Sequence, residues 1–379
     1  MDFSLSEEQE LVRETFSRFC DVEVKPKARA IDEAKEFPSD LFRALGGLGF
    51  FGLRYPESVG GSGLDFVSYC LAVSEIARGS LSLAAVASMQ SLMGTHFLYA
   101  LGDDSLRSRL LRPALRGEKI GTICITEPNA GSDLSSIATT ASPVAGGYRL
   151  DGQKMWITSA TVADFFTVLA RTGEERKLTI FLVEKGSPGL TVGKTIEKMG
   201  VWASPTSELS LDDCFVPEKH RLGEEGRGEE ELRTILASIR VMTGALALGV
   251  ARAALEDSVV YAAEREQFGS PINRFQAIQM KLAEMATDLE AATHLVRHAA
   301  WAQDRGSLTG SEAAMAKLFA TERAASICDQ ASRIFASYGY AMEYPIQRYL
   351  RDVRFTLFGG GTSEILKLVI AKEISRGRG

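Results

Sequence analysis

The 379-residue sequence has no excess of positive charge and no long apolar run. Its net charge is −6, with 43 Lys and Arg against 49 Asp and Glu, so its charge does not indicate a nucleic-acid-binding surface. No run of 18 apolar residues occurs, which argues against a membrane span. The first eight residues, Met-Asp-Phe-Ser-Leu-Ser-Glu-Glu, are acidic and lack the charged-then-apolar pattern of a secretion signal. We therefore expect neither nucleic acid nor membrane as a partner.

Cysteine and histidine are also scarce. The five cysteines are scattered and odd in number, which is typical of free thiols in a reducing cytoplasm. Only His294 and His298 have helical i,i+4 spacing, and no acid of a metal-binding motif lies between them. The sequence therefore predicts a cytoplasmic protein without a metal site.

Two common nucleotide-binding motifs are missing. No Gly-x-Gly-x-x-Gly follows a strand-like run, and no Walker loop occurs. A Rossmann or P-loop nucleotide site is therefore not expected.

The residues that are present predict an α+β fold with segregated layers. Residues 1–118 have helical periodicity, and a capping box is expected at Ser4 and Glu7. Residues 119–228 contain short strand-like runs bounded by Gly, Asp and Pro, which indicate a small β barrel or sandwich. Residues 229–379 return to long helices, expected from about Glu230 to Glu264, after Phe275, and from Gly310 to Tyr338. The expected strands are Ile120–Thr126, Tyr148–Leu150, Lys154–Thr158, Phe165–Ala170, Leu178–Val183, Leu190–Val192 and Leu209–Leu211.

A glycine-rich stretch near the C-terminus, Phe358-Gly-Gly-Gly-Thr-Ser-Glu-Ile365, has features of a reaction centre. Consecutive glycines permit positive φ and close approach of a ligand to the backbone. The free N–H groups at the start of the next helix favour negative charge. The simpler interpretation is a glycine turn before a buried helix, with Glu364 as a partner of the helix dipole.

Three other stretches offer groups for a ligand, and each also has a purely structural interpretation. The turn Thr126–Asp133 has hydroxyls and amides that suit a polar ring edge or a phosphate. Trp156 precedes Ile157 and Thr158 on a strand, where a Trp is usually buried. Arg265, at the end of a long helix, could hold a phosphate or complement the helix dipole.

Taken together and in order, these stretches resemble the acyl-CoA dehydrogenase family over essentially the whole chain. The matching motifs are Ile125–Asp133, Gly152–Thr158, Arg265–Ile272, Tyr338–Pro345 with Arg348, Arg351 and Asp352, and Gly361–Ile365. The resemblance implies an N-terminal helical domain (1–118), a middle β domain (119–228) and a C-terminal four-helix bundle (229–379). It also implies a homotetramer that binds FAD.

The resemblance further implies roles for individual residues. The flavin ring and ribityl chain should lie against Ile123, Ile125, Thr126, Gly131, Ser132, Trp156, Ile157 and Thr158. Arg265, Phe268 and Gln276 should reach the FAD of a neighbouring subunit. Arg333, Ser337, Thr362 and Glu364 should complete the cofactor site, although Ala336-Ser337 stands where family members often have two glycines. Ser132, Arg240 and Gly361 are expected to contact the substrate.

The two positions that usually supply the catalytic base both lack an acid. Most family members have a Glu directly before the Gly-Thr of the last motif, where this chain has Gly360. A second group has it directly before the residue matching Arg240, where this chain has Ile239. Three explanations remain open: Glu364 is a displaced base, another acid such as Glu230 or Glu231 moves in, or dehydrogenase activity is lost.

The sequence therefore predicts an FAD-dependent dehydrogenase of a short acyl thioester. Catalytic roles fall to Glu364 as base and to the Gly360 N–H as donor to the thioester oxygen. A base displaced by one turn could give γ,δ rather than α,β desaturation, and Ile239 adds bulk that favours a short chain. The substrate is an acyl-CoA or acyl-carrier protein, with an electron-transfer flavoprotein as electron acceptor and polyketide metabolism as a possible setting. The alternatives are a non-catalytic binding homologue and a flavin oxidase.

Overall fold

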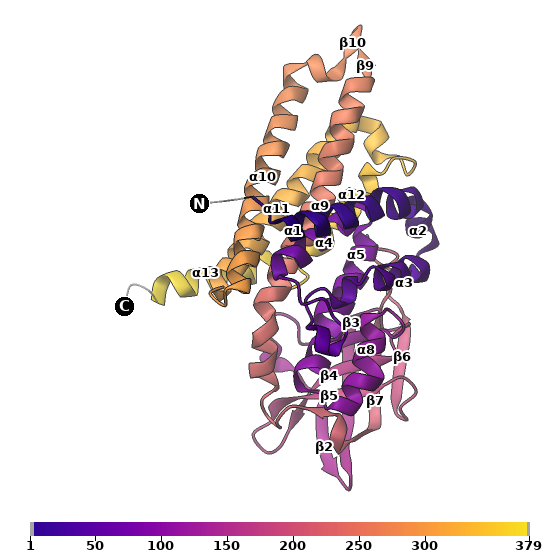
Figure 1. The fold of residues 1–379 in the computed structure, drawn as a ribbon, viewed down its shortest axis with the longest axis vertical. Helices are drawn as coiled ribbons and strands as arrows, with labels where there is room; N and C mark the ends of the chain where they lie inside the picture. Colours follow the sequence, from indigo (N-terminus) through magenta and orange to yellow (C-terminus); the bar gives the residue numbers. More distant parts are fainter. Residues whose placement is uncertain (1–3, 377–379) are drawn as a thin grey trace.

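The computed structural model describes residues 4–376, and three parts follow one another along the chain (Figure 1). Helices from both ends of the sequence pack together in the upper part of the view, and the strands of the large sheet form the lower part. One large apolar core is shared by the N-terminal and C-terminal helices, and a second, smaller core lies within the sheet. The predicted fold class is confirmed.

The N-terminal part is built from short helices. Helix α1 begins with a capping box between Ser6 and Gln9, so the predicted box at Ser4 and Glu7 was wrong by two residues. The apolar stretch 66–100 was expected to be one run of helix, but Ser80 is extended and divides it. The helices are α1 (Glu7–Phe19), α2 (Ala28–Ala34), α3 (Ser39–Gly47), α4 (Phe66–Gly79), α5 (Leu81–Ser88), α6 (His96–Leu101), α7 (Asp104–Leu106) and α8 (Arg112–Leu115).

The middle part is an eight-stranded sheet in the order β6-β7-β3-β2-β4-β5-β8, with β1 parallel to β4. Two pieces predicted separately, Tyr148–Leu150 and Lys154–Thr158, belong to one strand, β3, which pairs with β7 across two register shifts. The strands are β1 (Gly121–Cys124), β2 (Thr140–Val144), β3 (Gly147–Thr158), β4 (Phe165–Thr172), β5 (Lys177–Glu184), β6 (Leu190–Thr195), β7 (Thr206–Pro217) and β8 (Arg221–Leu222).

The C-terminal part is a helical bundle. Its long helices are α9 (Gly228–Glu264), α10 (Gln276–Asp304) and α11 (Gly310–Phe335), and the hairpin β9 (Glu266–Gln267) and β10 (Ser270–Pro271) joins the first two at the tip of the bundle. Helix α9 contains an 18-residue window apolar enough to cross a membrane, but 78% of that window is buried inside the protein, as in the core helix of a bundle.

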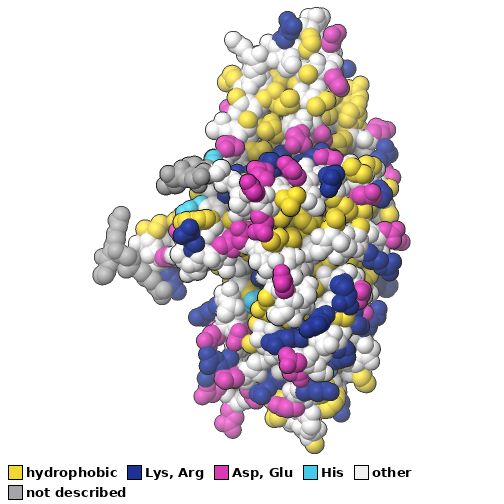
Figure 2. Space-filling view, viewed as in Figure 1, with side chains coloured by type: hydrophobic (Ala, Val, Ile, Leu, Met, Phe, Trp, Pro, Cys, Tyr) yellow, Lys and Arg dark blue, Asp and Glu magenta, His cyan; other side chains and the backbone are white. Residues whose placement is uncertain are grey.

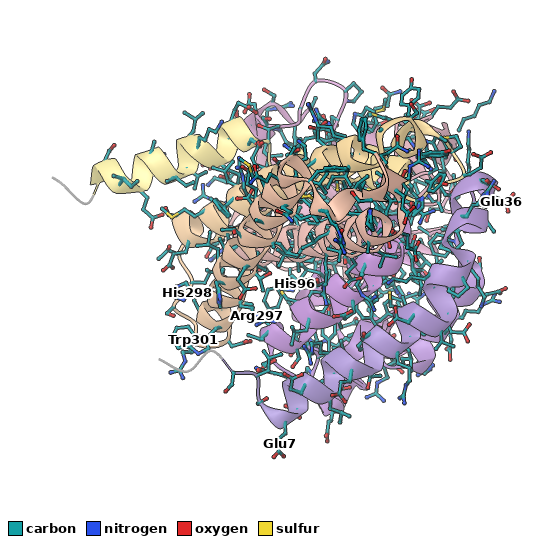
Figure 3. All side chains as sticks on the ribbon, turned by 90° about the horizontal axis from the view of Figure 1, so that it is seen from above. Glu7, Glu36, His96, Arg297, His298 and Trp301 are labelled. Atoms are coloured by element: carbon teal, nitrogen blue, oxygen red, sulfur yellow. The ribbon has the colours of Figure 1, made fainter. Side chains whose placement is uncertain are left out.

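Two shorter helices follow α11, α12 (Ile346–Val353) and α13 (Ser363–Arg376). Helix α13 projects away from the body of the molecule (Figure 3). Leu366 is fully buried, but Leu368 is 65% exposed. The expectation of a buried helix was therefore correct only for the first turn of α13 within this chain.

Candidate active site

The glycine-rich loop between α12 and α13 presents one free backbone donor. Gly360 and Gly361 have φ of +72° and +109°, which side-chain-bearing residues rarely adopt. The Gly359 N–H donates to the Phe355 carbonyl at 2.9 Å, and the Gly361 N–H donates to the Phe358 carbonyl at 3.2 Å. Within residues 4–376, the Gly360 N–H donates to nothing. The loop therefore leaves the Gly360 N–H available for a ligand oxygen.

The two positions that lack the usual base lie against each other. A Cβ atom built on Gly360 would be 3.3 Å from Ile239 Cγ2 and 3.1 Å from Thr243 Oγ1. Ile239 is only 6% exposed, and the Thr243 hydroxyl donates to the Ile239 carbonyl at 2.8 Å. The point at which either kind of family member would place a carboxylate is therefore occupied by a buried aliphatic side chain and a glycine.

The predicted base, Glu364, is the second residue of α13 and its side chain is exposed. It forms no hydrogen bond or ion pair with another residue in the described part of the chain. It follows Gly360 by four residues, but α13 begins only at Ser363 and Gly360 and Gly361 have positive φ, so these residues do not form the helical turn on which the prediction was based. The role of Glu364 as a base stays a prediction.

Arg240 lies next to Ile239 and beside a cavity of about 430 Å³ that Leu236, Ala237 and Leu308 also line. Its Nη1 donates to the Gly310 carbonyl at 3.4 Å, and its Nε is buried without a partner. Burial lowers the pKa of the guanidinium below its ordinary value. A half-buried cation beside a cavity suits the predicted substrate contact, because an anionic group would offset its lost hydration.

Helix α11 holds both ends of the glycine loop, and no motif in the sequence indicated this. The fully buried Lys317 donates from Nζ to the Leu357 carbonyl at 3.2 Å and to the Gly361 carbonyl at 2.8 Å. One turn and a half further along, Glu322 accepts a 2.6 Å hydrogen bond from the Ser363 hydroxyl.

A second group of predicted residues lies on the middle domain. Trp156 has a φ of +62° at a register shift of β3, and its side chain is 55% exposed, so the interpretation of this Trp as a core residue is wrong. Thr158 is partly exposed and Ile157 is buried. Gly131 and Ser132 are exposed in the turn after β1, and no atom lies within 4 Å of a Cβ built on Gly131.

A buried ion pair joins the two stretches of this second group. Lys154 Nζ lies 2.7 Å from Glu127 Oε1 and 3.3 Å from the Ile125 carbonyl, and the Met155 N–H donates to the Thr126 carbonyl at 2.8 Å. Burial would raise the pKa of Glu127, but hydrogen bonds from Lys154 and Thr139 outweigh it, so the pKa is below its ordinary value. The pair thus sets the turn around Thr126 and Ile125 against the strand that carries Trp156.

A third group lies at the tip of the bundle. Arg265 ends α9 and lies over the Tyr338 ring at 5.4 Å, Phe268 is 96% exposed on the hairpin, and Gln276 begins α10. Arg333 and Ser337 are exposed at the end of α11. In Figure 1 this tip and the sheet lie at opposite ends of the molecule, so one chain does not bring the third group to the second. This agrees with the prediction that Arg265, Phe268 and Gln276 reach the FAD of a neighbouring subunit, which stays a prediction. The role of Arg333 and Ser337 in completing the cofactor site also stays a prediction.

The residues present fit a flavin. An exposed indole at a strand bulge offers a flat apolar surface, and the adjacent hydroxyls and open glycine amides offer hydrogen bonds to a polar ring edge. A metal is a poorer fit, since no group of three or more His, Cys, Asp or Glu side chains in residues 4–376 could hold one. All five cysteines are buried free thiols.

Three family profiles match consecutive parts of the chain. They are described as the acyl-CoA dehydrogenase N-terminal domain (residues 6–118), middle domain (122–214) and C-terminal domain (226–375). The chain therefore belongs to the acyl-CoA dehydrogenase family, and it is an FAD-dependent oxidoreductase that acts on CH–CH groups of acyl thioesters.

Individual relatives narrow this further. The chain is 68% identical over 376 residues to a benzylmalonyl-CoA dehydrogenase of Aromatoleum aromaticum, covering 99% of this chain and all of that protein. A chain in a structure described as the electron transferring flavoprotein of Acidaminococcus fermentans is 37% identical with a TM-score of 0.96, covering 99% of both chains. The FAD complex of PigA is 30% identical with a TM-score of 0.95, also covering 99% of both.

Proposed function

We propose that this enzyme desaturates an acyl thioester that carries a carboxyl group on its α-carbon, and that loss of this carboxyl group as CO₂ replaces proton abstraction by a base. The substrate class is a 2-substituted malonyl-CoA, with an aryl group on the β-carbon as the favoured member. The product is the α,β-unsaturated acyl-CoA with one carbon fewer.

One observation carries the proposal: Ile239 and Gly360 meet where a carboxylate base is expected, and neither can accept a proton. An ordinary acyl-CoA has a C–H bond at its α-carbon and needs a base to become an enolate. A 2-carboxyacyl thioester reaches the same enolate when its C–C bond to the carboxylate breaks and the electron pair stays on the α-carbon. A site without a base therefore suits a substrate that needs none.

In this reaction the residues of the chain stabilise the charge that develops on the substrate and exclude water from its α-carbon. As CO₂ leaves, negative charge moves onto the thioester oxygen, where the free Gly360 N–H can donate a hydrogen bond. The apolar surface of Ile239 excludes water from the α-carbon, which protects the enolate from protonation. FAD, when bound, accepts the hydride that leaves the β-carbon. The atoms balance as one CO₂, one hydride and one unsaturated thioester for each substrate.

The name of the Aromatoleum relative supports this substrate class. A benzylmalonyl group has the required carboxyl group on its α-carbon and a benzylic hydrogen on its β-carbon, and that protein is 68% identical to this chain. Ile239 led us to predict a substrate with a short acyl chain. The proposed substrate keeps the short acyl chain but ends in a flat aryl group.

An anaerobic titration of the FAD-loaded protein tests the proposal. Benzylmalonyl-CoA should bleach the flavin band and release one CO₂ per flavin, with cinnamoyl-CoA as product. The matched compound 3-phenylpropanoyl-CoA, which lacks only the carboxyl group, should bind without bleaching. Bleaching by 3-phenylpropanoyl-CoA would contradict the proposal, because it requires a base.

A second candidate retains Glu364 as a displaced base. Its position four residues beyond Gly360, in the first turn of α13, supports it and would favour abstraction farther along the acyl chain, giving a γ,δ double bond. In that case Glu364→Gln would keep FAD bound and abolish turnover. Loss of CO₂ without a base instead predicts that Glu364→Gln keeps at least about half of the wild-type kcat, since the exposed side chain takes no part in that step. Product NMR and kcat of this variant decide between the two.

The remaining predictions concern partners and setting. An electron-transfer flavoprotein is the proposed electron acceptor, supported by the likeness to a chain in the Acidaminococcus structure. We propose a homotetramer, because large apolar side chains are exposed at the tip of the bundle and on α13, including Phe268 at 96%, Tyr340 at 89% and Leu368 at 65%. We propose the cytoplasm as its location, because all five cysteines are free thiols. Figure 2 shows apolar side chains exposed over the upper, bundle part of the face in view. Light scattering measures the assembly.

A carrier-protein substrate or a polyketide setting would be favoured if no CoA ester bleached the flavin.

A further inference from the structure

The loop that carries Gly360 has little to hold it in place by itself. Three consecutive glycines have the largest backbone freedom of any tripeptide. Their own hydrogen bonds are local, from Gly359 to Phe355 and from Gly361 to Phe358. The helix that follows, α13, projects from the body and buries mainly Leu366. The loop therefore needs an anchor from elsewhere if the Gly360 N–H is to keep one direction.

Lys317 is placed to be that anchor. Its amine is fully buried and donates to carbonyls on both sides of Gly360, those of Leu357 and Gly361. Both carbonyls would otherwise be unpaired within the described residues, since neither accepts another hydrogen bond there. Burial lowers the pKa of Lys317 to about 8, so the amine still carries its charge at neutral pH, when its bonds to the carbonyls are strongest.

Glu322 extends the anchor to the start of α13. Its carboxylate accepts a hydrogen bond from Ser363, and its charge also favours the protonated form of Lys317. The two side chains come from one helix, α11, so three residues around Gly360, namely Leu357, Gly361 and Ser363, are held by a single rigid element.

We propose that Lys317 and Glu322 are positioning residues for the desaturation reaction, which hold the glycine loop so that the Gly360 N–H points at the thioester oxygen. Of the two residues, Lys317 has the larger effect on the position of the loop, because its two hydrogen bonds lie on either side of Gly360. The inference rests on desaturation at this loop and holds whether the enolate arises by loss of CO₂ or by a base.

The test separates positioning from stability by a signal from a bound thioester. The absorption band of cinnamoyl-CoA moves to longer wavelength when its carbonyl oxygen accepts a hydrogen bond, so the shift on binding reports the Gly360 N–H. Lys317→Met and Lys317→Arg would be compared with the wild-type holoenzyme for this shift, for FAD content and for kcat and KM. Lys198→Met is the matched control, because Lys198 also has a pKa lowered to about 8 by burial and donates to one carbonyl, that of Ser204, in the middle domain.

The expected result is a red shift in the wild type that is lost in Lys317→Met, with FAD retained and kcat lowered about 10- to 100-fold at little change in KM. Lys317→Arg should recover part of the red shift and part of kcat, because a guanidinium can still donate to two carbonyls. Lys198→Met should keep the shift. An unshifted band in the wild type, or a full shift in Lys317→Met, would overturn the proposal. Failure of the proposed function would instead appear as absence of CO₂ from benzylmalonyl-CoA.

Discussion

Gly360 combines a left-handed backbone with close contact to Ile239 and Thr243, so a single methyl group is predicted to disturb it. Gly360→Ala should cost about 1–2 kcal/mol of stability, because an L-residue is strained at positive φ. It should also lower kcat, because the loop must shift to relieve the contact and the Gly360 N–H moves with it. Urea unfolding and steady-state kinetics measure the two effects. Gly47→Ala is the control, since nothing lies within 4 Å of a Cβ at Gly47. Unchanged kcat in Gly360→Ala would refute the assigned role of this N–H.

His96 is predicted to make the fold sensitive to acid. It lies at the boundary between the N-terminal helices and the bundle (Figure 3), and burial together with the Arg54 charge lowers its pKa to about 3. Because Arg54 Nη2 lies 3.3 Å from Nδ1, that nitrogen is the acceptor and Nε2 bears the proton. Between pH 6.5 and 3 the unfolded state binds a proton that the folded state does not, so stability falls as the pH is lowered through this range. Urea midpoints at pH 7.5 and 5 should differ less in His96→Gln than in the wild type, whereas the exposed His298→Gln should behave like the wild type.

At the level of elements, the contact between α4 and α9 depends on a glycine. A Cβ built on Gly249 would lie 2.2 Å from the Ser74 carbonyl oxygen and 2.6 Å from Ala77 Cβ, so the two helices must separate to accept it. Gly249→Ala is expected to destabilise the protein by about 1–3 kcal/mol, despite the better helix propensity of Ala. A chemical-denaturation curve gives the value. An unchanged or higher free energy of unfolding in Gly249→Ala would mean that α4 and α9 are not in such close contact at this glycine.

The sequence predicted long elements better than short ones. Helix α9 was placed within two residues, because many turns of apolar periodicity reinforce one another. Strand β2 was missed, because Thr-Ala-Ser-Pro-Val has weak strand character and is held by pairing with β3. The exposure of Trp156 follows from a register shift between β3 and β7, and no local pattern encodes such a shift.

The site was predicted from motifs, and its geometry was not. The sequence indicated that Ile239 and Gly360 both lack an acid, but only the fold brings these distant positions into contact. Lys317 has no signature, because a single Lys in a helix is usually solvent-exposed and its buried role depends on carbonyls forty residues away.

At the level of the whole molecule, Arg351 connects all three parts of the chain. It bonds Asp32 of α2 at 2.5 Å and stacks on Trp202 of the middle domain at 3.8 Å, and the adjacent Asp352 accepts a 2.6 Å bond from the Val201 N–H. Arg351→Met should destabilise the protein by about 3–5 kcal/mol, because it leaves Asp32 buried without a counter-charge.

Calorimetry checks this prediction, and it should also separate the melting of the middle domain from that of the helices. Arg116→Met, which breaks the exposed pair with Glu118, is the control and should leave Tm unchanged. A single unshifted transition in Arg351→Met would show that the three parts are held together elsewhere.

The separation between the sheet, whose strand β3 carries the exposed Trp156, and the hairpin tip has a genetic consequence. If each cofactor is enclosed by the strand bulge of one chain and the tip of another, a bulge-defective chain and a tip-defective chain each keep the half that the other has lost. Mixed together, two inactive variants would regain intact sites in which both halves are sound. Activity would then belong to pairs of chains, and a defective allele could be partly rescued by a different defective allele.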